Sequence, residues 1–170
     1  MSQNDGYVSV YDHDLLIDSR FLRRTFLAGV LAILTAIALE GIASYFIPHS
    51  RRREIALAAL LAPIVEESVK AFFSVELSKI HPASGFFVGL YFGIIESLLY
   101  AASFGIGLIG SLYLFSIRLL VSVPLHAATT SMFLYGLFIQ ENKKEGSPLF
   151  RIFSAYLIHA LFNFSLTAVG

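Results

Sequence analysis

The sequence has no cysteine and few charged residues. Without cysteine the chain has no disulfides, no thiolate metal ligands and no cysteine nucleophile. Charged residues make up 14% of the 170 residues, against roughly 25% in a soluble domain, whereas 56% are hydrophobic and the mean hydropathy is +0.74. Twelve basic residues balance twelve acidic ones, so no nucleic-acid partner is indicated. This composition predicts an integral membrane protein.

Aspartate is missing from the whole body of the chain. Its only occurrences, at positions 5, 12, 14 and 18, lie in the polar N-terminal stretch. An aspartyl intramembrane protease would therefore have no catalytic pair. The H-E-x-x-H pattern of many zinc proteases is also absent.

The apolar segments predict an all-α, polytopic membrane protein, a bundle of five or six transmembrane helices of about 20 residues each. Residues 1–24 are expected to form a polar tail with a short interfacial helix over 12–24. Residues 25–170 are expected to form a single transmembrane helical domain. Spans are predicted at about 25–47, 54–78, 86–104 and 149–169.

The apolar block 105–140 is too long for one upright span. Glycines loosen its start and Pro124 can break it, so we interpret it as a short or re-entrant helix followed by a span over 122–140. The predicted orientation of the chain in the membrane depends on how the block 105–140 is divided into helices. Six spans put the basic loops 51–53 and 143–151 on one side and favour an external N-terminus. With five spans, the N-terminal tail, Lys79 and loop 143–151 lie on the same side of the membrane, which favours an internal N-terminus.

Ionisable residues within the apolar segments indicate a site, because each would cost about 2.5–3.5 kcal/mol at the bilayer centre without partners. Glu66 and Glu67 lie about twelve residues into the second predicted span. Glu96 and His159 each lie about ten residues into theirs. At 1.5 Å per residue these side chains fall in one layer near mid-bilayer. The depth of His126 depends on where its span begins.

Glutamates and histidines in such a layer are typical of a site that activates water. A carboxylate can act as general base, and an imidazole can polarise a carbonyl or protonate a leaving amine. The same groups could hold zinc or another divalent metal with one position open. The ligands would then be Glu67, Glu96, His126 and His159. Metal-activated and glutamate-activated water are both open at this point.

Lys70 and Arg118 are expected to support the site, and Asn163 is expected to belong to its catalytic residues. Lys70 stands at i+4 from Glu66 and can pair with it. Asn163 stands at i+4 from His159 and can orient the imidazole or the attacking water. Arg118 could steady a carboxylate.

Titratable groups in a membrane also suit another class of protein, a proton- or cation-coupled transporter or a non-catalytic membrane scaffold. A relay needs such groups spaced along a path. A hydrolase needs them packed around one point. The spatial arrangement therefore discriminates the two.

Four short motifs in order resemble those of PrsW-type intramembrane proteases, which are related to the CAAX-processing and bacteriocin-processing (CPBP) superfamily. The motifs are "EESVK" at 66–70, "FGIIE" at 92–96, "PLHAATT" at 124–130 and "HALFN" at 159–163. The superfamily pattern is E-E-x-x-x-R, F-x-x-x-H and H-x-x-x-N. Lys70 and Glu96 depart from that pattern and fit the PrsW-type variant better.

The resemblance implies an intramembrane endopeptidase in a prokaryotic cell membrane. Glu66 or Glu67 would be the general base, and Glu96, His126 and His159 would complete the site. The implied partners are membrane lipids and a membrane-anchored protein or peptide substrate, such as an anti-sigma factor.

Overall fold

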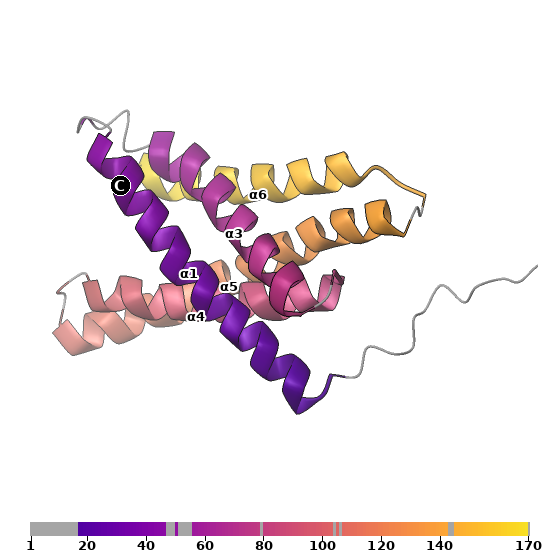
Figure 1. Cartoon of the computed structure of the whole chain (residues 1–170). Helices are drawn as coiled ribbons and strands as arrows, with labels where there is room; N and C mark the ends of the chain where they lie inside the picture. Colours follow the sequence, from indigo (N-terminus) through magenta and orange to yellow (C-terminus); the bar gives the residue numbers. More distant parts are fainter. Residues whose placement is uncertain are drawn as a thin grey trace, which may run out of the picture.

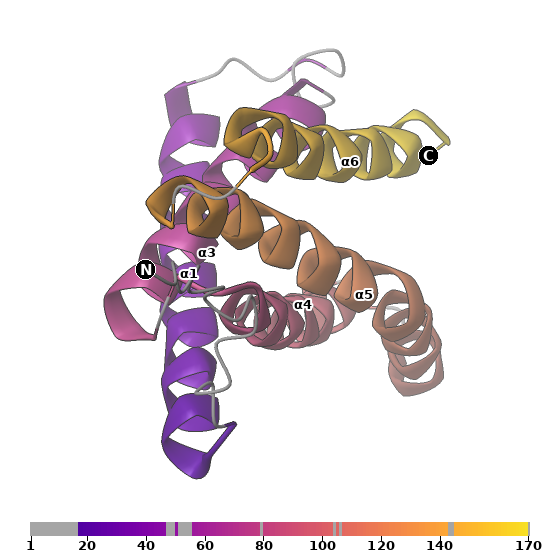
Figure 2. The same ribbon diagram turned by 90° about the vertical axis from the view of Figure 1, so that its right-hand side faces the viewer.

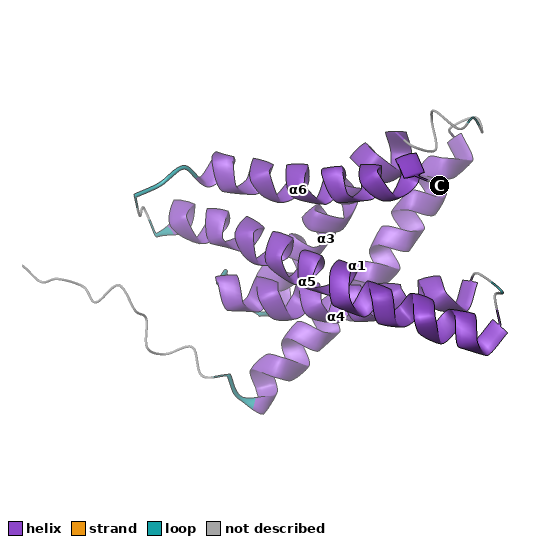
Figure 3. Cartoon of the chain, turned by 180° about the vertical axis from the view of Figure 1, so that it is seen from behind, coloured by secondary structure: helices purple, strands orange, loops and turns teal. Residues whose placement is uncertain are grey.

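The regular structure of the protein is entirely helical within the part of the chain that the computed structural model describes, residues 17–46, 50, 56–78, 80–103, 105, 107–142 and 145–169 (Figures 1 and 3). The elements are α1 (Ser19–Phe46), the π-helical turn η1 (Leu57–Leu61), α3 (Ala62–Leu77), α4 (Pro82–Ser103), α5 (Gly107–Glu141) and α6 (Pro148–Val169). This confirms the predicted all-α class.

The helices form a bundle around α3. Helices α4 and α5 make an antiparallel hairpin, and α6 returns along the second half of α5 (Figures 1 and 2). Helix α1 crosses this hairpin obliquely, and α3 contacts α1, α4, α5 and α6. The end of α1, the start of η1, the α4–α5 turn and the C-terminal end of α6 all lie on one side of the molecule, the left in Figure 1.

Helix α1 begins earlier than the first predicted span. The carboxylate of Asp18 accepts a hydrogen bond from the backbone N–H of Phe21 at 2.7 Å, so Asp18 caps the free donors at the start of the helix. Residues 19–24 therefore belong to α1, which continues without a break into the first predicted span. The rest of the predicted interfacial helix over 12–24 falls mainly on residues 12–16, which lie outside the described residues.

Helix α5 corrects the prediction for the block 105–140. It runs without a break from Gly107 to Glu141, with Pro124 inside it. Proline is tolerated in membrane helices because neighbouring groups can satisfy the backbone carbonyl that it leaves free. The 35 residues of α5 extend about 52 Å at 1.5 Å each, more than the roughly 30 Å of a hydrocarbon core.

Within the described part of the chain, three helices, α1, α4 and α5, are long and apolar enough to cross a membrane. The count of five or six spans stays a prediction.

Helix α3 turns a polar stripe toward the centre of the bundle. Its residues Val65, Val69 and Phe73 pack on an apolar cluster that includes Ile33 and Phe92. A second buried cluster, formed by Ala71, Phe133, Leu134 and Ala155, lies against another face of α3. At 100° per residue, the stripe formed by Glu66, Lys70 and Ser74 falls between these two apolar faces. The same periodicity that packs α3 thus points its charged residues inward.

Candidate functional site

Charged side chains from three helices converge at the centre of the bundle and are almost completely buried. Glu66, Glu67 and Lys70 come from α3, His126 from α5 and His159 from α6, and none is more than 6% exposed. Buried charges persist only when they are paired, hydrogen-bonded or bound to a metal. The contacts of each group therefore show what it can do.

Glu67 is fully engaged by hydrogen-bond donors. Its Oε1 accepts from Lys70 Nζ at 2.7 Å, from Thr129 Oγ1 at 2.9 Å and from His159 Nδ1 at 2.9 Å. Its Oε2 accepts from Thr130 Oγ1 at 2.9 Å. With both oxygens engaged and no exposed surface, Glu67 serves to hold its neighbours in place.

The contact with Glu67 fixes the state of the His159 ring. An ionised carboxylate can only accept, so Nδ1 of His159 must carry the hydrogen that it donates. In the neutral imidazole the lone pair then lies on Nε2, which is 3.7 Å from Glu66 Oε2. A histidine whose second nitrogen is held by a carboxylate is the usual arrangement of a metal-binding histidine.

His126 is held in the same way, with its nitrogens exchanged. Lys70 Nζ lies 3.0 Å from His126 Nδ1, and an ammonium has no acceptor, so Nδ1 must carry the lone pair. The hydrogen is then on Nε2, which donates to Glu96 Oε2 at 3.1 Å. That lone pair accepts the hydrogen bond from Lys70, and Nδ1 also lies 3.7 Å from Glu66 Oε2, so a metal bound at Nδ1 would replace Lys70 as its partner.

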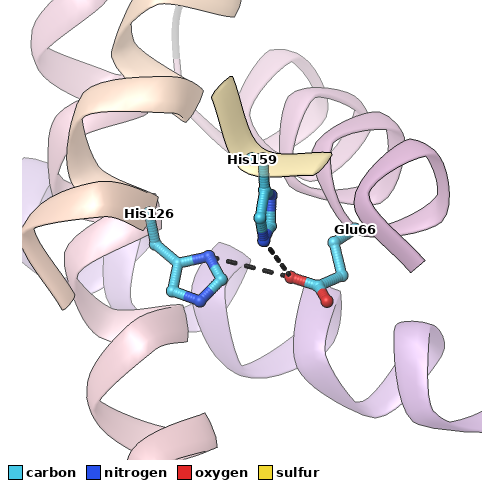
Figure 4. Close-up of side chains that lie close together, drawn as sticks. All are labelled: Glu66, His126 and His159. Carbon is cyan, nitrogen blue, oxygen red and sulfur yellow. Dashed lines mark ion pairs between the residues drawn. The ribbon is translucent and has the colours of Figure 1, made fainter. Parts of the chain in front are cut away.

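Glu66 differs from its neighbour Glu67 in having an unsatisfied oxygen. Its Oε2 is buried and has no hydrogen-bond partner in the described part of the chain, although Lys70 Nζ lies 3.6 Å away. Figure 4 shows this oxygen pointing between the rings of His126 and His159. Glu66, His126 and His159 each offer one ligand atom, and these atoms all lie within 4.8 Å of one another.

This spacing suits a tetrahedral metal ion. Ligand atoms bonded to zinc at about 2.1 Å stand about 3.4 Å apart in a tetrahedron. The two distances of 3.7 Å from Glu66 Oε2 to the histidine nitrogens are close to that value. One carboxylate and two neutral imidazoles are a donor set that zinc prefers, and they would leave a fourth position open. The three residues therefore fit a catalytic metal.

Glu96 is fixed from its other side by Arg118. Arg118 Nη2 donates to Glu96 Oε2 at 2.5 Å, and its guanidinium stacks over the ring of Tyr100 at 4.2 Å. Ser122 Oγ lies 3.4 Å from the same oxygen of Glu96. A chain of contacts thus runs from Arg118 through Glu96 to His126.

A cavity of about 510 Å³ connects this centre with the side of the molecule where α1 ends. Its walls come from α1, η1, α3, α4, α5 and α6. The polar lining comprises Glu40, Ser44, Glu66, Glu96, Tyr100, Arg118 and Asn163. A polar cavity in an apolar bundle gives water a way to the buried groups.

The position of His126 depends on close contact between α4 and α5. A Cβ atom added at Gly89 would lie 2.2 Å from the backbone oxygen of His126, and one at Gly93 would lie 3.0 Å from its ring. Only glycine lets the two backbones approach this closely. Gly89 and Gly93 of α4 thus allow the His126 ring to reach its position in the bundle.

The structure brings most of the predicted site residues together, with contacts that differ from the predicted ligand set. The predicted ligand set held Glu67 and Glu96 with the two histidines, whereas the three ligand atoms that meet come from Glu66, His126 and His159. Glu67 and Glu96 instead accept hydrogen bonds from the histidines.

Other residues were missed or placed elsewhere. Thr129 and Thr130 were missed, although their positions three and four residues after His126 put them on its helix face. Glu40, near the end of the first predicted span, also lines the cavity.

Taken together, these features define a helical membrane protein with a buried glutamate–histidine centre reached by a polar cavity. Residues 18–170 match the PrsW family of intramembrane metalloproteases, so the chain belongs to this family. It is thus a member of a family of membrane proteases, and its apolar helices agree with that environment. No curated protein and no solved structure matches the chain. The wider relation to the CPBP superfamily stays a prediction.

Proposed function

We propose that the protein is an intramembrane metallopeptidase that hydrolyses peptide bonds of membrane-anchored substrates. Glu66, His126 and His159 would hold a divalent metal such as zinc. The observation that carries this proposal is the buried Oε2 of Glu66, which has no hydrogen-bond partner among the described residues and lies 3.7 Å from one ring nitrogen of each of His126 and His159. When bound, the metal supplies Lewis acidity that lowers the pKa of water and polarises the substrate carbonyl.

The surrounding residues orient the ligands. Glu67 holds His159 by Nδ1, and Glu96 holds His126 by Nε2, so the other nitrogen of each ring keeps its lone pair. Lys70 and Arg118 pair with these two carboxylates and supply positive charge beside them. Loss of such an orienting residue typically costs 10- to 100-fold in metal affinity or activity.

Hydrolysis also needs a group that moves a proton. The hydroxyl of water adds to the carbonyl carbon, the C–N bond breaks, and the proton taken from water goes to the leaving amine. Glu67 is enclosed by donors, whereas Glu96 lines the cavity and is 27% exposed. With Glu66 engaged as a ligand, Glu96 is the carboxylate placed to accept that proton and return it.

The arrangement supports a hydrolase more than a transporter or a scaffold. The titratable groups pack around the single oxygen Oε2 of Glu66. A proton relay would need them spaced along a path across the membrane.

Cleavage of a tagged single-span reporter in proteoliposomes tests the proposal. We expect the wild type to cleave it, and Glu66→Gln and His159→Ala to lose at least about 100-fold in rate. Glu76→Gln is the matched control, because Glu76 is an exposed carboxylate on the same helix. A chelator should stop cleavage and zinc should restore it. Cleavage that resists the chelator but requires Glu66 would mean that this carboxylate acts on water directly. Equal cleavage by all variants would contradict the site.

A further inference from the structure

Glu40 is a charged residue of the cavity that the proposed chemistry does not use. It lies in the C-terminal part of α1 and lines the same cavity as Glu66 and Glu96. Its Oε1 is buried and has no hydrogen-bond partner in the described part of the chain. A carboxylate oxygen in this state is unfavourable unless a ligand supplies the missing donor.

The other carboxylates of the centre each have an assigned partner. Glu67 pairs with Lys70 at 2.7 Å and Glu96 pairs with Arg118 at 2.5 Å. Glu66 faces the two imidazoles and is the proposed metal ligand. Among the described residues lining the cavity, Arg118 is the only Lys or Arg, and it is already held by Glu96 and Tyr100. Among the described residues, Glu40 is the carboxylate of the cavity for which no pairing with a Lys or Arg is seen.

We propose that Glu40 forms a subsite for a basic side chain of the substrate, a lysine or arginine within a few residues of the bond that is cut. This inference rests on the proposed function, since the cavity would hold the substrate next to the metal ligands. A cationic side chain would supply the donor that Oε1 lacks. It would also find in Glu40 a counter-charge that lipid cannot provide. The protein would thereby prefer membrane segments with a basic residue at this depth.

Binding of synthetic span peptides to the full chain in lipid nanodiscs tests this subsite without requiring cleavage. The probes are fluorescent 21-residue Leu/Ala peptides that each carry one Lys, Gln or Glu. In a series of peptides, this residue is placed at each position of one helical turn around the middle of the peptide. The protein is kept in chelator so that no peptide is cut. At the best position we expect wild type to bind the Lys peptide at least 10-fold more tightly than the Gln peptide.

Three variants show whether Glu40 causes that preference. Glu40→Gln should lose about 10-fold in affinity for the Lys peptide and none for the Gln peptide. Glu40→Lys should prefer the Glu peptide. Glu76→Gln, which removes an exposed carboxylate elsewhere, should behave as wild type, and circular dichroism confirms that each variant is folded.

The outcomes separate this inference from the proposed function. Equal binding of the Lys and Gln peptides by wild type, binding of neither, or a preference that persists in Glu40→Gln would overturn the subsite. If the Lys peptide binds preferentially through Glu40 but the zinc-loaded protein leaves it intact, the subsite stands and the peptidase proposal fails. If zinc-loaded wild type cuts all peptides with no preference for Lys, the peptidase stands and the subsite fails.

Discussion

The charge of Glu67 should matter for stability, whereas the charge of Glu66 should matter mainly for activity. The substitution Glu67→Gln keeps the shape of the side chain and an acceptor at Oε1 for its three donors. The new amide faces Thr130, whose hydroxyl can turn to accept instead of donate. The main change is therefore the loss of the negative charge beside Lys70.

The expected magnitude follows from the burial of that pair. Lys70 and Glu67 are both 0% exposed, and removing one partner of a buried ion pair typically costs about 3–5 kcal/mol. Lys70 can still approach Glu66, whose Oε2 is 3.6 Å away. We therefore expect a loss near the lower limit, about 3 kcal/mol. For a chain of this size, that corresponds to roughly 6–12 °C in melting temperature.

Circular dichroism at 222 nm during thermal unfolding in detergent measures this effect. Glu66→Gln is the matched control, because Oε2 of Glu66 makes no hydrogen bond, and it should change stability by less than about 1 kcal/mol. Adding Lys70→Met to Glu67→Gln removes the unpaired ammonium and should recover most of the lost stability.

Equal melting temperatures for Glu67→Gln and Glu66→Gln would refute the reasoning. So would a double variant that is less stable than Glu67→Gln alone. Either result would mean that Lys70 does not depend on Glu67 for its charge in the folded protein.

Two further predictions concern helix packing and orientation. Gly89→Ala should lower the melting temperature and weaken zinc binding, because its Cβ would lie 2.2 Å from the backbone oxygen of His126. In the control Gly41→Ala the new Cβ meets nothing within 4 Å, so the melting temperature should stay unchanged or rise. Calorimetry measures both variants, and equal melting temperatures would contradict this prediction. With five crossings, the positive-inside rule predicts an internal N-terminus. Because the sequence has no cysteine, single cysteines can be introduced, and an impermeant maleimide on intact cells should label Ser50→Cys but not Ser147→Cys. The reverse labelling pattern would show the opposite orientation.

The sequence was sufficient for the all-α class, and most of the residues that it predicted for the site lie close together in the structure. A low charge content, long apolar segments and a few embedded ionisable residues leave few alternatives to a helical membrane bundle. The spacing of Glu66 and Lys70 also predicted that the two can pair, since they share one helix face, and their charged atoms lie 3.6 Å apart.

Helix boundaries were harder to predict because local signals compete. Pro124 indicates a break by the rules of soluble helices, yet α5 continues through it, as membrane helices often do. Asp18 looked like part of a polar tail, but its side chain caps α1 and starts the helix six residues early.

The roles of the adjacent glutamates could not be predicted from their positions. Glu66 and Glu67 are 100° apart on α3, and only tertiary contacts decide which one meets which partner. Thr129 and Thr130 on α5 and Nδ1 of His159 on α6 engage Glu67 and leave Glu66 for the ligand group. The sequence shows the residue types of the site, but the second layer of contacts that assigns their roles forms only when the helices pack.

X-ray absorption at the zinc edge, together with the zinc content of the purified protein, tests the central claim most directly. We predict one zinc per chain, with two imidazole nitrogens and a carboxylate oxygen at about 2.0–2.2 Å and no cysteine sulfur near 2.3 Å. His159→Ala should lose one imidazole from the spectrum, and Glu66→Gln should lose most of the zinc. No stoichiometric zinc, or a zinc spectrum that is the same in wild type and both variants, would contradict a metal centre formed by Glu66, His126 and His159.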